Sequence, residues 1–261
     1  MRRLAVACLL VAGFAGAVAA ADDDLIDPDR PDIAFGAKTI QPGRVQLESG
    51  LLFERTRTAR EPTERRWSGE ATLRVGAAKG LELRLDGEPI VRLRGADDVT
   101  DVGDLTLGAK WRFFDPPDGG SWPALALNPF VKLPTAPEPI GSGKTDFGLR
   151  LIASFDLPAH FSLDTNAAVA AIGQTRPSGH LVQAQVTASL SREILRNVST
   201  YGEVFYLSRE TRDARDQVGF DAGVVWRILP NFAVDAAVGT SLYGPLPDVF
   251  VRAGGSIRFG R

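Results

Sequence analysis

The chain has 261 residues, with 30 basic and 32 acidic side chains and a single cysteine. A net charge of −2 leaves no excess of cationic side chains to hold a phosphate backbone, so nucleic acid is excluded as a partner. The length suits one domain, because barrels and sandwiches of this size commonly fold as a single unit.

The first 21 residues have the parts of a secretory signal peptide. Arg2 and Arg3 precede an apolar run over residues 4–18, and small residues surround the expected cleavage point near Ala19 to Ala21. The run is shorter than the roughly 20 apolar residues that span a bilayer, which disfavours a permanent anchor. Cys8 lies within this segment, so the mature chain would have no disulfide.

Residues 22–42 are acidic and rich in Asp and Pro, and they show no sustained periodicity. Two interpretations remain open for this segment. It is either a flexible periplasmic leader or a plug folded into the domain that follows. Residues 43–261 form that domain.

Residues 104–114 alternate without interruption between apolar and polar side chains. Leu105, Leu107 and Trp111 fall on one parity, while Lys110 and Arg112 fall on the other. A period of two predicts an extended strand with one apolar and one polar face.

The same period recurs through the rest of the domain, with Gly- and Pro-rich connections between the runs. In residues 81–91, it places Leu81, Leu83, Leu85 and Val91 on one face. The predicted strands cover residues 44–55, 66–75, 81–91, 104–114, 124–133, 146–155, 161–171, 180–191, 198–207, 217–228, 232–240 and 248–259. About twelve strands of about ten residues, with unequal connections at the two ends, are typical of a single all-β, antiparallel, up-and-down transmembrane barrel.

The direction of the apolar face distinguishes this barrel from a soluble sandwich. A sandwich would place its largest side chains at mid-strand, whereas the large aromatic residues here lie near strand ends. Aromatic residues at strand ends form the interfacial girdles of membrane barrels. We therefore predict a lipid-facing girdle of Trp67, Trp111, Phe113, Phe155, Phe161, Trp226, Phe232 and Phe259.

The polar parity carries full charges at mid-strand, and in a membrane barrel these would line the lumen. The candidate lumen residues are Arg74, Arg84, Asp86, Lys110, Arg112, Arg150, Glu203, Asp221 and Arg252. Acids and bases are nearly balanced on this face, which argues against a strongly ion-selective ring and favours ion pairs between strands. Either these are solvated wall residues with no role toward a solute, or the bases on neighbouring strands, from Arg74 to Arg150, form a constriction.

Motifs for chemistry are weak. Residues 141–145, Gly-Ser-Gly-Lys-Thr, lack the leading glycine of a phosphate loop and precede a predicted strand. His160 and His180 fall at opposite strand ends, which disfavours a histidine metal site. An outer-membrane hydrolase with His180 as its base is the enzymatic alternative, but no serine stands beside it in a convincing arrangement. We therefore predict no catalytic, metal or cofactor site and no enzyme.

Several short stretches resemble an outer-membrane β-barrel family described as phenol-degradation (MetA-pathway) proteins and transporters. The resemblance covers nearly all of the mature chain. The matching stretches are residues 29–32, 43–50, 81–85, 102–110 and 246–250. It implies a barrel that passes small, often hydrophobic or aromatic, compounds. Many such barrels end on an aromatic residue that the assembly machinery recognises, whereas here Gly260 and Arg261 follow Phe259.

These observations predict a channel in the outer membrane of a Gram-negative bacterium, exported through the signal peptide, for passive passage of small organic compounds. The expected partners are outer-membrane lipid, the barrel-assembly machinery through the C-terminal strand, and an organic solute of unknown identity. The alternative is a structural or surface-interaction barrel whose lumen is sealed by side chains and by residues 22–42.

Overall fold

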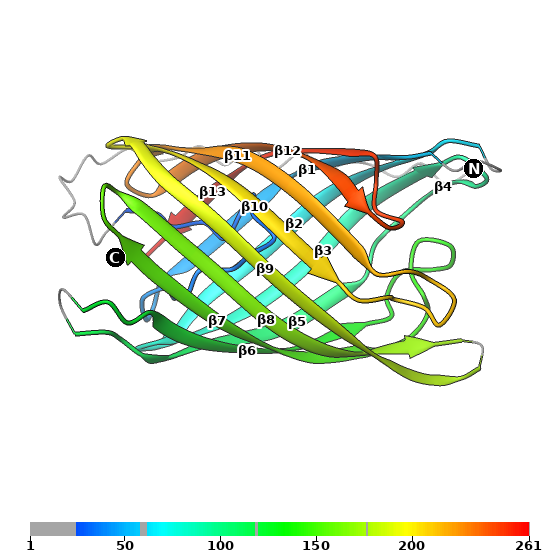
Figure 1. Ribbon diagram of the computed structural model, residues 1–261, viewed down its shortest axis with the longest axis horizontal. Coiled ribbons are helices and arrows are strands. Elements are labelled where there is room, and N and C mark those ends of the chain that lie inside the picture. The colour runs from blue at the N-terminus through cyan, green and yellow to red at the C-terminus, as the bar shows by residue number, and fades with distance from the viewer. Residues whose placement is uncertain (1–24, 58–61, 118–119, 176, 261) are drawn as a thin grey trace.

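The computed structural model describes residues 25–57, 62–117, 120–175 and 177–260. The predicted signal peptide, residues 1–21, lies outside the described residues. The described residues form a barrel whose long axis is horizontal in Figure 1. They contain no helix long and apolar enough to cross a membrane.

Antiparallel strands make up the whole wall, as the alternating sequence predicts. The strands are β1 (Val45–Thr56), β2 (Glu64–Ala78), β3 (Leu81–Arg94), β4 (Asp98–Asp101), β5 (Leu105–Phe114), β6 (Ala124–Leu133), β7 (Asp146–Leu157), β8 (Phe161–Gln174), β9 (Gly179–Leu195), β10 (Val198–Leu207), β11 (Gln217–Leu229), β12 (Phe232–Tyr243) and β13 (Val249–Phe259). Pairing of β1 with β13 closes the ring, which leaves no free edge in the twelve-strand wall. The predicted fold is confirmed.

The thirteenth strand, β4, lies between the predicted strands of residues 81–91 and 104–114, where no strand is predicted. It pairs only with the end of β3, Val91 to Arg94, whereas β5 pairs with residues 81–87 of the same strand. The amide of Gly103 donates to the carbonyl of Glu88 (2.8 Å) between the two ladders. β4 and β5 therefore pair with successive parts of β3 and together form one interrupted strand of the wall. With only four residues, β4 is too short to show a period of two in the sequence.

The interruption faces a bulge in β3 that reverses its side-chain alternation. Gly69 pairs with Ile90 and Ala71 with Gly87, so two residues of β3 lie opposite one of β2. Pro89 at this point has no amide hydrogen to donate to the ladder. Val91, predicted to share the outer face with Leu81, is instead fully buried, and Ile90 is 54% exposed.

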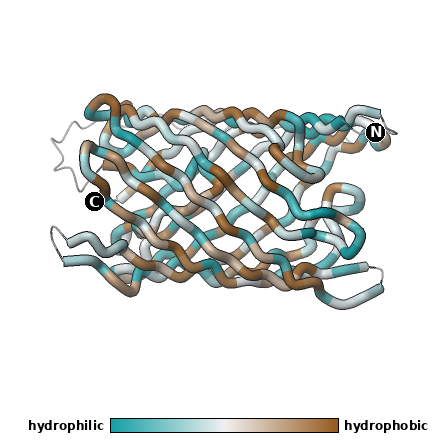
Figure 2. Tube along the Cα trace, viewed as in Figure 1, coloured by the Kyte–Doolittle hydropathy of each residue, from teal (hydrophilic) through white to brown (hydrophobic). Residues whose placement is uncertain are grey.

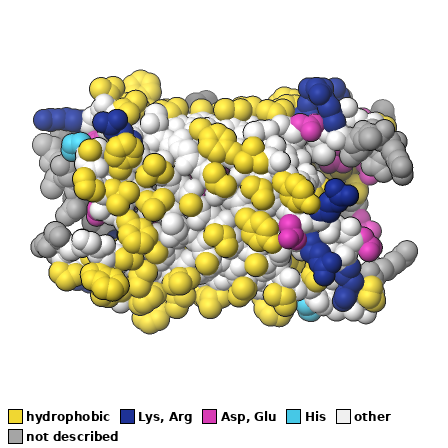
Figure 3. All heavy atoms as spheres, viewed as in Figure 1, with side chains coloured by type: hydrophobic (Ala, Val, Ile, Leu, Met, Phe, Trp, Pro, Cys, Tyr) yellow, Lys and Arg dark blue, Asp and Glu magenta, His cyan; other side chains and the backbone are white. Residues whose placement is uncertain are grey.

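The apolar parity faces outward and the charged parity faces inward. In β5, Leu107 is 44% exposed whereas Lys110 is fully buried. Hydrophobic and hydrophilic residues alternate along the strands (Figure 2). In the space-filling view, hydrophobic side chains spread along the visible face, while charged ones gather mainly at the right-hand end (Figure 3). This arrangement suits a wall that faces lipid and encloses polar side chains.

The two ends of the barrel differ. The turn end carries the short connections such as residues 79–80 and 230–231 together with the end of β13; the loop end carries longer connections such as residues 134–145 and 208–216. Apart from Trp67, all of the predicted girdle residues lie near the turn end. At the loop end, Trp67 packs on Phe53, with ring centroids 4.3 Å apart, and Phe147 and Tyr243 are exposed there.

Candidate functional site

Residues 25–43, here called the luminal segment, lie inside the ring of strands, where the deep-blue trace of Figure 1 runs. The amide of Ile26 donates to the carbonyl of Pro230 (2.7 Å), and that of Gly43 donates to the carbonyl of Gly76 (3.0 Å). Both contacts are at the turn end. The segment therefore enters and leaves at the turn end, and its middle residues, including the buried Ala34 and Ala37, lie against the inner wall.

Asp29 of the luminal segment contacts three cations from neighbouring strands. Its carboxylate accepts from the Nζ of Lys110 on β5 (2.8 Å) and from the guanidinium of Arg84 on β3. Arg74 on β2 lies 3.5 Å away. We call these three residues, together with Arg150 on β7, the basic wall.

Two wall carboxylates complete this network. Glu82 lies 2.9 Å from Arg74 and Glu48 lies 2.8 Å from it, and all three side chains are at most 1% exposed. Buried charges are tolerated only when each has close partners, and removing one partner from such a network is costly. The cross-strand ion pairs expected in the lumen are therefore present, but they are centred on a residue that comes from outside the wall.

The charge of Asp29 follows from these contacts. Burial alone would raise its pKa, but the opposing charges of the three cations hold the pKa of Asp29 well below its usual range. Asp29 is thus ionised, and it neutralises part of the basic wall.

Arg30, the next residue, turns toward the adjoining part of the wall, where β1 and β13 lie between β2 and β12. It lies 2.8 Å from Glu70 on β2 and 3.3 Å from Asp235 on β12. Space for its guanidinium comes from Gly50 and Gly254, which face each other across β1 and β13. A Cβ at Gly50 would come within 2.3 Å of Arg30 Nη2, and one at Gly254 within 2.7 Å. Small residues are needed at both positions for this close approach.

The backbone beyond Arg30 is bonded to wall side chains. The amides of Ile33 and Ala34 both donate to the carboxylate of Glu203 at 2.7 Å. Asn166 accepts from the amide of Phe35 (2.7 Å) and donates to its carbonyl (2.9 Å). The luminal segment forms no strand, so these side chains take over the backbone hydrogen bonds that a sheet would supply.

The wall facing the basic wall is acidic. Glu203 on β10 and Asp221 on β11 are direct cross-strand neighbours, and both are fully buried. Asp32 of the luminal segment lies on this side, where it accepts a hydrogen bond from Ser189 (2.6 Å). Burial raises the pKa of Asp32 well above its usual range; the Ser189 hydrogen bond opposes this and the charge of Glu203 adds to it.

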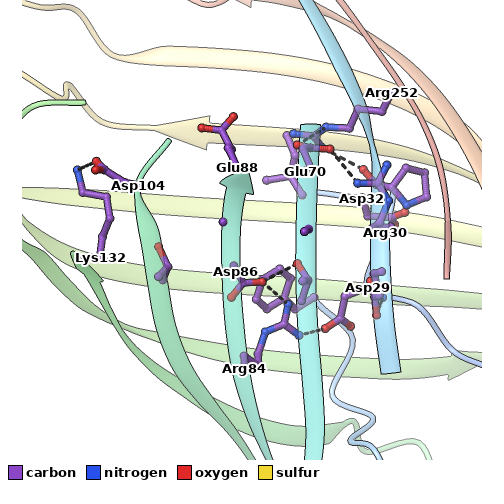
Figure 4. Close-up of a pocket in the computed structure, with 18 of the residues that line it drawn as sticks. Asp29, Arg30, Asp32, Glu70, Arg84, Asp86, Glu88, Asp104, Lys132 and Arg252 are labelled. Atoms are coloured by element: carbon purple, nitrogen blue, oxygen red, sulfur yellow. Dashed lines mark hydrogen bonds and ion pairs between the residues drawn. The ribbon is translucent and has the colours of Figure 1, made fainter. Parts of the chain in front are cut away.

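Two adjacent cavities occupy the lumen on the loop-end side of the luminal segment. One is about 460 Å³ in volume and is lined by residues 29–33 of the segment, by Glu70 and by Asp104 (Figure 4). The other is about 370 Å³ and lies against β6 to β9. The ring of Phe35 borders both, with the guanidinium carbons of Arg84 and Arg150 at 4.3 and 4.1 Å from its centroid. Such distances are those of cation–π contacts.

All but one of the nine predicted lumen residues lie around the luminal segment and the cavities. Most of them contact the luminal segment or line a cavity: Arg74, Arg84, Asp86, Lys110, Arg150, Glu203 and Arg252. Asp221 is buried beside Glu203. Arg112 is separate from them, because it pairs with the exposed Asp115 (2.5 Å) at the turn end.

The residues of the candidate site that sequence reasoning did not assign are mainly those of the luminal segment: Asp29, Arg30, Asp32 and Phe35. Their only signal was the Asp29–Asp32 motif, whose residues bond to opposite walls. Lys132 was also missed; it lies 3.1 Å from Asp104 and 2.8 Å from Asp146.

The enzymatic alternative has no support at His180. Its ring centroid lies 5.3 Å from that of Phe147, which is 53% exposed on the outer surface. Residues 141–145, the phosphate-loop candidate, precede strand β7 and no helix follows them. Among the described residues, no group of three or more His, Cys, Asp and Glu side chains could hold a metal ion.

Comparisons with solved structures place the fold among outer-membrane barrels. An outer membrane channel from Pseudomonas putida F1 aligns with a TM-score of 0.71 and 14% identity, over 90% of this chain and 100% of that chain. The NanC porin has a TM-score of 0.55 and 9% identity, over 82% of this chain and 98% of its own. The KdgM porin, solved with disordered oligogalacturonate, also has a TM-score of 0.55 and 9% identity, over 83% and 99%. At these identities the likeness is one of fold.

No curated protein matches the chain in sequence. A family model does match, over residues 28–259, which include the luminal segment from Pro28 onward and nearly the whole wall. The resemblance noted in the sequence is thereby confirmed, and the chain belongs to the family described as "Putative MetA-pathway of phenol degradation".

Proposed function

We propose that this protein is a passive outer-membrane channel for small organic compounds, including hydrophobic and aromatic ones. The observation that carries the proposal is the pair of adjacent cavities in the lumen, about 460 and 370 Å³, on the loop-end side of the luminal segment. Each is within the size range of small-molecule sites. Their lining mixes charged, amide and apolar side chains, which suits transient contact with an organic solute.

The outer-membrane location is supported by the apolar outer face and by the fold shared with an outer membrane channel. Lipid would contact the exposed apolar side chains of the wall. The barrel-assembly machinery would recognise β13, whose last residue, Phe259, is 44% exposed. The proposal assigns the protein no catalytic step.

A structural barrel with a sealed lumen is the second candidate. The observation that favours it is the bonding of the luminal segment, which connects Asp29 to β5 and Asp32 to β9 on the far side of the ring. In this case the cavities would be blind pockets, and no solute would cross.

Conductance in planar bilayers separates the two candidates. We expect small openings from the intact mature protein, and several-fold larger ones from a variant that lacks residues 25–42. The segment lies inside the ring of strands and borders the larger cavity, so its removal widens the path. A folded barrel migrates differently before and after boiling in detergent, and this shift serves as the control that the deletion variant is assembled. If the folded intact protein produces no openings, the sealed barrel is the correct function, whether or not the deletion variant opens.

A further inference from the structure

We propose that the smaller lumen cavity, between β6 and β9, is a binding site for a small aromatic carboxylate, with Arg150 as the anchor of the carboxylate group. The inference deepens the proposed channel function, on which it rests, by naming the class of solute. It follows from the cavity walls, from the contacts of Arg150 and from the pairing of the charges around it.

The cavity lining combines apolar and polar side chains from neighbouring strands. Phe130, Ala168, Ala170 and Ile172 contribute apolar surface. Arg150, Asn128, Gln183 and Gln185 contribute polar groups, and Ala168 lies directly between Arg150 and Gln185 in the sheet. A volume of about 370 Å³ gives room for a single-ring compound. A lining that sets apolar surface beside one guanidinium fits a ligand with an apolar body and one polar group.

Arg150 has no carboxylate within ion-pair distance among the residues that the structure describes. Its polar contacts are long ones to amide oxygens, 3.4 Å from Nη1 to Asn128 and 3.5 Å from Nη2 to Gln185. Its Nε is buried without a hydrogen-bond partner. A planar guanidinium is suited to bidentate binding of a carboxylate. The guanidinium of Arg150 can therefore still bind a carboxylate, because no carboxylate of the described residues occupies it.

The other charges at this cavity are already paired. Asp86 accepts from Arg84 (3.1 Å) and from Thr72 (2.8 Å). Lys132 lies between Asp104 and Asp146, at 3.1 and 2.8 Å. An incoming anion thus meets one cation without a direct partner.

The apolar part of the lining decides between classes of anion. Inorganic ions and short aliphatic acids would leave Phe130 and Ile172 without contact, whereas an aromatic ring would cover them. Burying that apolar area adds to the affinity in proportion to its size. Neutral phenols would fill the same space but leave Arg150 unpaired.

Calorimetric titration of the detergent-solubilised mature protein with benzoate, phenol and acetate tests the site without any transport step. Benzoate is expected to bind at least about tenfold more tightly than phenol or acetate, as a charge-assisted pair plus ring burial would give. Arg150→Gln should weaken benzoate by about tenfold or more and leave phenol unchanged. Ala170→Leu, which fills part of the cavity and keeps the charge, should weaken the binding of benzoate and phenol alike.

Arg112→Gln is the matched control, because it removes a lumen-face arginine that pairs with Asp115 outside both cavities. It should bind benzoate as the unaltered protein does. Heat-dependent migration confirms that each variant is folded.

The site is disproved if folded wild-type protein does not bind benzoate, if phenol binds as tightly, or if Arg150→Gln leaves benzoate affinity unchanged. Bilayer conductance is measured separately, so a channel that conducts without binding benzoate refutes the site alone, and benzoate binding without conductance refutes the channel alone.

Discussion

Replacing Asp29 by alanine is expected to release the luminal segment from the basic wall. The change leaves Arg74, Arg84 and Lys110 short of a buried counter-charge. Removing one member of a buried ionic network costs about 3–5 kcal/mol. Since the wall keeps its own hydrogen-bonded ladders, we expect this cost to fall on the docking of the segment and not on barrel assembly.

Thiol labelling measures the release. The mature chain is predicted to have no cysteine, so Ala37→Cys places a single thiol at a position that is fully buried. In the Asp29→Ala background, maleimide should react at least about a hundredfold faster, as a loss of about 3 kcal/mol in docking implies.

Asp27→Ala is the matched control on the same segment. Asp27 has a 45% exposed side chain and lies 3.7 Å from Arg227, a distance at which an exposed pair contributes about 1 kcal/mol or less. The labelling rate should therefore change little. Equal rates in the two backgrounds would show that Asp29 does not hold the segment.

Leu107→Arg has the second large expected effect. Leu107 is 44% exposed on the outer face, between Leu85 and Val131 of the adjacent strands. An arginine that faces lipid near the bilayer midplane costs about 2–4 kcal/mol. We expect a loss of this size in the free energy of unfolding, measured by denaturant titration in lipid vesicles.

Thr106→Arg places the same side chain one residue away and on the other face. Thr106 lines both lumen cavities, where the added guanidinium has polar surroundings. Its cost should be less than about 1 kcal/mol. If Thr106→Arg proved the more damaging change, the assignment of inner and outer faces would be wrong.

The alternating pattern was enough to predict the strands of the wall, because lipid on one side and the polar lumen on the other select the side chain at each position. Lipid outside and a polar lumen inside require the alternation seen in residues 104–114, and the structure has Leu107 outward and Lys110 inward accordingly. Where alternation was ambiguous, as in β10, closure of the ring decided the faces: Tyr201 and Phe205 are buried inside, and the hydroxyl of Tyr206 donates to Asp216 (2.9 Å).

The errors arose where pairing with a neighbour overrides the local period. The bulge at Glu88 and Pro89 puts Val91 on the side opposite to the predicted one, and it leaves β4 as a short piece of an interrupted strand. Nothing in a period-two pattern indicates where an extra residue will be accommodated, since that depends on the register of two strands at once.

By itself, the sequence determined an all-β barrel of twelve wall strands, with a lipid-facing apolar face and a charged lumen face, because each of these properties depends on neighbours one or two residues away. Only the tertiary structure decided what the charges do. Asp29 meets Arg84 and Lys110 from 55 and 81 residues away. The sequence of residues 25–43 has no period that would place them inside the barrel. Their position depends on buried charges that need partners, and closure of the ring brings those partners together.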